Sequence, residues 1–75
     1  MIRVAVLGAG RIGQIHAANV AAHRLATLVA VADPIAAASA KLAEKLGCEA
    51  STDAEALIAR ADIDAVVIGT PSDTH

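Results

Sequence analysis

The sequence predicts an α/β fold in which strands and helices alternate around a parallel sheet. Apolar, β-branched runs alternate with helical stretches along the 75 residues, and this order is typical of parallel strands joined by helical crossovers. A glycine-rich segment, residues 8–13, directly follows the first apolar run. Glycines at that point allow the chain to turn from a strand into a helix. We therefore expect four strands in the order 3-2-1-4, which is the first half of a doubly wound sheet.

The first half of the chain predicts a strand over residues 2–7, a helix over 11–23 and a strand over 27–32. Small residues give the helix one face that suits close packing on a sheet, namely Gly13, Ala17, Val20 and Ala21. The dipeptide Asp33-Pro34 ends the second strand, and proline is acceptable at the start of the next helix.

The second half predicts a helix over residues 35–46, which ends at Gly47 as a C-cap. A short strand follows over residues 48–50. The spacing from Thr52 to Glu55 is that of a capping box and opens a helix that runs to about Ala61. The last strand, residues 65–69, is very apolar, as buried parallel strands are. Residues 70–75 are expected to form the loop at its carboxyl end.

The spacing of Gly8, Gly10 and Gly13 is that of a dinucleotide-binding turn. Gly8 allows a sharp turn, Gly10 lets the backbone approach a pyrophosphate, and Gly13 allows the helix to pack closely. The N–H groups of the helix start, near Arg11 and Ile12, point at the phosphates. In the alternative interpretation, the glycines serve packing alone.

Asp33 follows the last of these glycines by 20 residues and closes the second strand. A carboxylate there accepts hydrogen bonds from the adenosine ribose and repels a 2′-phosphate, so the sequence favours NAD over NADP. Pro34 and Ile35 add no positive charge beside it, whereas Arg11 could pair with a phosphate. The alternative is that Asp33 is only a turn or cap residue.

Three segments, residues 8–17, 31–34 and 64–75, together resemble the amino-terminal domain of the Gfo/Idh/MocA oxidoreductase family. The Gly-Arg-Ile-Gly-x-Ile-His run and the Thr-Pro-Ser-Asp-Thr-His ending most resemble its inositol dehydrogenases. The resemblance implies an NAD(P)-dependent oxidoreductase with two domains that acts on a sugar, a cyclitol or a related polyol. It places Thr70 and Pro71 near the ribose and nicotinamide end of the cofactor. It also places the proton-transfer residues beyond residue 75, so none is assigned here.

The remaining reactive side chains give weaker signals. His16, on the first helix, is expected to be structural, and His23 is expected to end that helix. His75 follows the cofactor-side loop and either approaches the cofactor or closes the loop against the next helix. Cys48 has no partner for a disulfide within the chain and is expected to be a small buried hydrophobic residue. The spacing of His and Cys predicts no metal site.

Length and charge limit the possible functions. A formal net charge of −2 without a basic patch argues against nucleic acid, and no apolar run reaches membrane-spanning length. The chain begins directly with a strand and holds a single cysteine, so we expect a cytoplasmic protein. We expect residues 1–75 to be the amino-terminal part of a dinucleotide-binding domain in a longer, homo-oligomeric enzyme. The alternatives are an NAD-binding regulatory module without catalysis and a related reductase. The Thr-Pro-Ser-Asp-Thr-His ending fits such reductases poorly.

Overall fold

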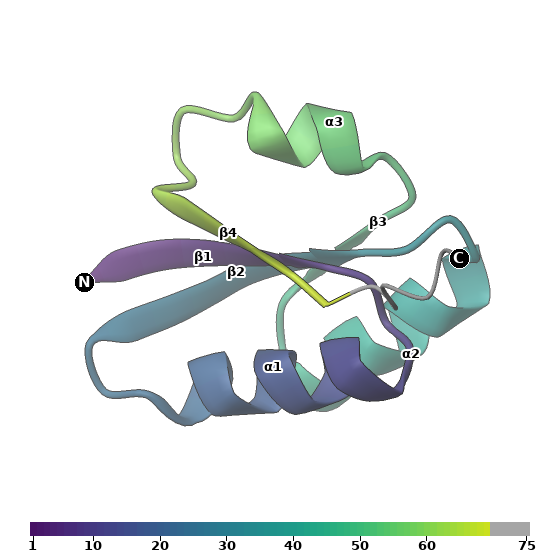
Figure 1. Cartoon of the computed structure of the whole chain (residues 1–75), viewed down its shortest axis with the longest axis horizontal. Coiled ribbons are helices and arrows are strands. Elements are labelled where there is room, and N and C mark those ends of the chain that lie inside the picture. The colour runs from purple at the N-terminus through teal and green to yellow at the C-terminus, as the bar shows by residue number, and fades with distance from the viewer. Residues whose placement is uncertain (70–75) are drawn as a thin grey trace, which may run out of the picture.

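The computed structural model describes residues 1–69 and contains one four-stranded sheet (Figure 1). Its strands are β1 (Ile2–Leu7), β2 (Ala26–Ala32), β3 (Glu49–Ser51) and β4 (Ala65–Ile68). They lie in the order β3-β2-β1-β4, and every pair is parallel. The predicted strand order is therefore confirmed. The carboxyl ends of β1 and β4 lie next to each other, which is the switch point of such a sheet.

The helices cover both faces of the sheet (Figure 1). The two longer helices, α1 (Arg11–Ala22) and α2 (Ala36–Leu46), lie on one face, and α3 (Ala54–Ile58) lies on the other. The chain advances in one direction from β1 to β3 and then returns to β4. Crossovers of one hand therefore place α3 opposite the first two helices.

Two small cores fill the space between these layers. On the α1 and α2 side, Val6 and Val31 of the sheet pack with Ala17, Leu42 and Ala43 of the helices. On the α3 side the core consists of alternate strand residues and one helix residue, namely Ala5, Leu7, Ala30, Ala32 and Leu57. Successive strand residues thus point to opposite faces, and small side chains allow the helices to lie close to the strands.

The ends of several elements differ from the prediction by one residue. The helix α1 ends at Ala22 because His23 is already extended, and β2 begins at Ala26. Likewise α2 begins at Ala36, since Ile35 is extended, and β3 runs one residue later than predicted because β2 pairs with residues 49–51. Gly47 caps α2 with a left-handed φ of 74°, as predicted.

The start and the end of α3 differ more from the prediction. Its N-cap is Asp53, whose side chain accepts a 3.1 Å hydrogen bond from the N–H of Ala56. The capping box predicted to start at Thr52 is therefore wrong by one residue. The helix ends at Ile58 instead of near Ala61, because the N–H of Arg60 bonds three residues back to Leu57 and tightens the last turn.

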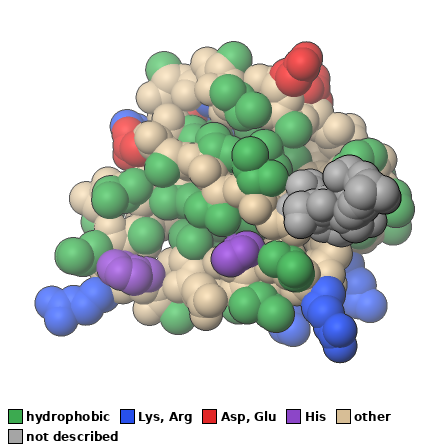
Figure 2. Space-filling view, in the orientation of Figure 1, with side chains coloured by type: hydrophobic (Ala, Val, Ile, Leu, Met, Phe, Trp, Pro, Cys, Tyr) green, Lys and Arg blue, Asp and Glu red, His purple; other side chains and the backbone are tan. Residues whose placement is uncertain are grey.

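The strand β4 is less buried than its apolar sequence predicts. Its central residues are half-buried, while Ala65 is exposed and Ile68 is 67 % exposed. Within residues 1–69, β4 is an edge strand, since it pairs with β1 alone. Figure 2 shows hydrophobic side chains across the middle of the molecule. In the same view, Figure 1 shows β4 there. The predicted face of α1 is also shorter than expected, because Ala21 is exposed.

Two arginine side chains hold the segment between α3 and β4. Arg3 forms a fork with Asp64 through two 3.0 Å hydrogen bonds, and it holds the pKa of that carboxyl at about 2. Arg60 bonds Glu49 at 2.9 Å and Asp62 at 2.6 Å, which lowers the pKa of both carboxyls. These pairs are partly exposed, so we expect each to contribute little to stability in water.

Candidate functional site

The chain turns from β1 into α1 through Gly8 and Gly10. Gly8 has a φ of 103°, a conformation that side chains disfavour, so the predicted sharp turn is present. Gly10 is the N-cap of α1 and is extended, with φ −76° and ψ −167°. A Cβ added to Gly10 would meet no other part of residues 1–69 within 4 Å, its two chain neighbours aside. The structure therefore leaves open space above Gly10, as close approach of a ligand requires.

Gly13 and Gly69 bring the turn and the end of β4 together. A Cβ on Gly13 would lie 2.5 Å from the carbonyl carbon of Gly8, so only glycine fits there. A Cβ on Gly69 would lie 2.6 Å from the Cα of Gly13. Gly69 is not among the residues for which the sequence predicts a role in the site. The sequence does carry a signal for this glycine, because it directly follows an apolar run that is expected to form a strand beside the glycine turn.

Among the described residues 1–69, no side chain caps the start of α1. Gly10 offers no side chain, and the first turn holds no acidic residue. In contrast, Asp53 caps α3 and Glu55 lies in its first turn. The first N–H groups of a helix have no partner within the helix, and together with the helix dipole they favour an anion. The geometry at Arg11, Ile12 and Gly13 thus suits a phosphate group.

Asp33 joins the end of β2 to the glycine turn. Its Oδ2 accepts a 2.8 Å hydrogen bond from the N–H of Ala9, and its Oδ1 accepts one of 2.9 Å from the N–H of Ile35. Asp33 therefore does hold the turn, as the alternative interpretation of the sequence expects. A carboxylate has about four acceptor positions, so two remain for a ligand. Asp33 can serve both purposes, and it forms no ion pair with residues 1–69.

A pocket of about 280 Å³ opens beside Asp33 at the carboxyl ends of the strands. Most of its lining is apolar, which suits the flat ring of a nucleobase. It is lined by Leu7, Gly8, Ala32, Asp33, Pro34, Thr52, Ala54 and Ile68. The pocket therefore joins the glycine turn to the carboxylate in one continuous site.

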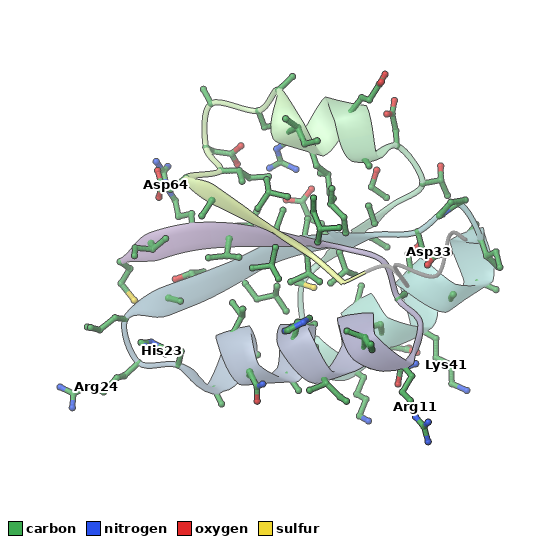
Figure 3. All side chains as sticks on the ribbon, viewed as in Figure 1. Arg11, His23, Arg24, Asp33, Lys41 and Asp64 are labelled. Atoms are coloured by element: carbon green, nitrogen blue, oxygen red, sulfur yellow. The ribbon has the colours of Figure 1, made fainter. Side chains whose placement is uncertain are left out.

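The side chain of Arg11 lies apart from this pocket. In Figure 3 it points away from Asp33 and extends on the same side as Lys41. Neither Arg11 nor Lys41 lines the pocket beside Asp33. The guanidinium of Arg11 therefore does not neutralise Asp33, although the backbone of Arg11 begins α1 at the glycine turn.

The other sequence candidates are partly placed. His23 is the C-cap residue that follows α1, and its Nδ1 accepts a 3.1 Å hydrogen bond from the N–H of Leu25. Cys48 is half-buried, and burial raises the pKa of its thiol, which does not favour a reactive cysteine. The predicted cofactor contacts Thr70, Pro71 and His75 lie outside the described residues. Across residues 1–69, no three His, Cys, Asp or Glu side chains gather as metal ligands.

Within the same residues, every helix is too short or too polar to cross a membrane.

Comparison with known proteins identifies the family. The model of the Gfo/Idh/MocA oxidoreductase family, NAD-binding Rossmann fold, matches residues 2–75. An inositol 2-dehydrogenase of Rhizobium meliloti (strain 1021) is 54 % identical over 74 residues, which is 99 % of this chain and 22 % of that protein. The chain thus spans about a fifth of the length of this relative.

Solved structures agree with this result. A myo-inositol dehydrogenase of Corynebacterium glutamicum superposes with a TM-score of 0.87 at 48 % identity, over 95 % of this chain and 21 % of that one. A scyllo-inositol dehydrogenase of Lactobacillus casei, solved with NAD(H) and scyllo-inositol, gives 0.86 at 36 % identity, over 100 % and 23 %. The glycine turn, the strand order and these matches agree, and the chain belongs to the Gfo/Idh/MocA family of oxidoreductases, to whose NAD-binding Rossmann fold it corresponds.

Proposed function

We propose that the full-length protein is an NAD-dependent dehydrogenase that oxidises a secondary alcohol of a cyclitol or sugar, as inositol 2-dehydrogenases do. The observation that carries this proposal is the uncapped start of α1 beside Asp33. Relatives named inositol 2-dehydrogenase and scyllo-inositol 2-dehydrogenase (NAD(+)) support the choice of substrate class. When bound, NAD supplies the hydride acceptor, and the protein supplies binding and orientation.

In this proposal, different residues of the chain bind different parts of the cofactor. The N–H groups of Arg11, Ile12 and Gly13 hold the pyrophosphate, with Gly8 and Gly10 shaping the turn below it. Asp33 accepts hydrogen bonds from the adenosine ribose, and the pocket beside it takes the base.

We also propose that Thr70, Pro71 and His75 contact the nicotinamide half. No residue of this segment is assigned a proton transfer. The preference for NAD over NADP rests on Asp33, since a 2′-phosphate at its carboxylate would meet a like charge. We further propose a cytoplasmic location and a homo-oligomeric state for the full-length protein.

The test measures NADH formation by the purified full-length protein with NAD and myo-inositol, and then with scyllo-inositol. We expect turnover with at least one of these polyols, and a larger kcat/KM with NAD than with NADP. The separately expressed 75-residue chain is expected to bind NAD weakly and to form no NADH. Tight NAD binding by the full-length protein without turnover of any polyol would instead support a regulatory NAD-binding module.

A further inference from the structure

His16 lies on α1 against the end of β4. A Cβ placed on Gly69 would be 3.4 Å from the Cδ2 of His16, so the edge of the imidazole faces the backbone there. Gly69 is buried, and its N–H donates a 2.8 Å hydrogen bond to the carbonyl of Leu7. This backbone position is fixed to β1 on one side and to α1 on the other. The imidazole therefore supports the point at which the chain leaves the sheet.

The same edge of the ring carries a polar atom. Cδ2 is bonded to Nε2, so this nitrogen lies next to the ring atom that faces Gly69. His16 is half-buried, and neither of its ring nitrogens forms a hydrogen bond within residues 1–69. His23, at the other end of the helix, is exposed and accepts a hydrogen bond from Leu25. The two histidines of α1 thus differ in surroundings as well as in place.

His16 and Asp33 lie on opposite flanks of β1. Asp33 follows β2 and holds the N–H of Ala9, whereas His16 packs against Gly69 at the end of β4. The sheet order places β2 and β4 on the two sides of β1. A dinucleotide lies across this switch point, with its pyrophosphate at the helix start. If Asp33 takes the adenosine ribose, the β4 flank faces the nicotinamide half.

We propose that His16 is a positioning residue for the nicotinamide half of the cofactor, an inference that rests on the proposed function. Its ring supports the backbone at Gly69, and its Nε2 supplies a hydrogen-bonding group on the β4 flank of the crevice. This role goes beyond the packing role that the sequence predicts for His16. It requires a polar atom at the position of Nε2, and an apolar side chain of similar size cannot replace it.

The test compares NADH with ADP-ribose, which lacks the nicotinamide. Kd values for both are measured by titration of full-length wild type, His16→Leu, His16→Gln and the control His23→Leu. We expect His16→Leu to raise the Kd for NADH about three- to tenfold, the effect of one lost hydrogen bond. ADP-ribose affinity should stay within about twofold, because its contacts lie at the helix start and on the Asp33 flank. His16→Gln, whose amide reaches the position of Nε2, should recover most of the NADH affinity.

Three results would overturn the inference. They are an NADH Kd for His16→Leu equal to that of His23→Leu, an equal loss for ADP-ribose, and a Gln variant no better than Leu. If His16→Leu does not fold, His16→Asn replaces it with the same expectations, since its amide is too short to reach Nε2. A wild type that binds NADH but oxidises no polyol would refute the proposed dehydrogenase and leave this comparison readable. A wild type that binds no NADH would refute both.

Discussion

Alanine at Gly10 and alanine at Gly13 should separate cofactor binding from folding. A Cβ on Gly10 would enter open space, whereas a Cβ on Gly13 would lie 2.5 Å from the carbonyl carbon of Gly8. The same substitution three residues apart therefore meets opposite surroundings. We expect Gly10→Ala to fold normally and bind NAD poorly, and Gly13→Ala to lose stability.

The magnitudes follow from the backbone geometry. Gly10 is the N-cap of α1, where alanine is worse than glycine by about 0.5–1 kcal/mol. Alanine also reduces the conformational freedom of the unfolded chain, which stabilises the folded state by about 0.4–1 kcal/mol, because φ −76° is accessible to alanine. The two effects cancel to within about 0.5 kcal/mol. At Gly13 the added methyl meets backbone that no rotamer can move aside, so the loss is about 1–3 kcal/mol or more.

The assay combines urea unfolding with NADH titration of the full-length protein. For Gly10→Ala, the free energy of unfolding should match wild type, while the Kd for NADH should rise at least about tenfold, or 1.4 kcal/mol. The reasoning would be refuted by a Gly10→Ala protein that binds NADH as wild type does. It would also be refuted by a Gly13→Ala protein of unchanged stability.

Three further predictions concern other parts of the fold. Asp33→Ala should weaken NAD more than NADP, by about 1–3 kcal/mol, because ribose hydroxyls lose their acceptor; titration of the full-length protein with both cofactors measures the ratio. Arg3 lowers the pKa of Asp64 to about 2, so the stabilisation is complete above the unfolded pKa near 4 and is lost as pH falls through 2. Acid unfolding should therefore show Asp64→Asn less stable than wild type at pH 7 and equal to it below pH 2. Leu57→Ala should cost about 2–5 kcal/mol, since Leu57 is 3 % exposed, whereas Ile58→Ala, at a 57 % exposed position, should change urea stability by less than about 0.5 kcal/mol.

The strand order and the glycine turn could be predicted because local sequence determines them. A strand that ends in glycine before a helix has few alternatives, and crossovers of one hand then fix the order. The positive φ of Gly8 and the left-handed cap at Gly47 were also readable, since glycine is the residue that suits these conformations.

Features that depend on distant contacts could not be predicted in this way. The start of α3 depended on whether Thr52 or Asp53 turned its side chain toward the helix, and both are acceptable caps. The close approach of Gly69 to Gly13 joins residues 56 positions apart in sequence and follows only from the pairing of β4 with β1. The exposure of Ile68 likewise depends on the neighbours of the strand, which its own apolar sequence does not specify.

The two roles of Asp33 decide how its substitution should be interpreted. Ala9 is buried, its N–H is held by Asp33 and its carbonyl accepts a 3.1 Å hydrogen bond from Gln14. The glycine turn is therefore held in place by a residue of β2's end as well as by α1, before any cofactor binds. Loss of the Asp33 carboxylate loosens this turn for every dinucleotide, since NAD and NADP share the pyrophosphate. Only the ribose contact differs between the two cofactors, so the ratio of their affinities isolates that contact, and the NAD affinity alone does not. A fall in both affinities with an unchanged ratio would show that Asp33 holds the turn and does not bind the ribose.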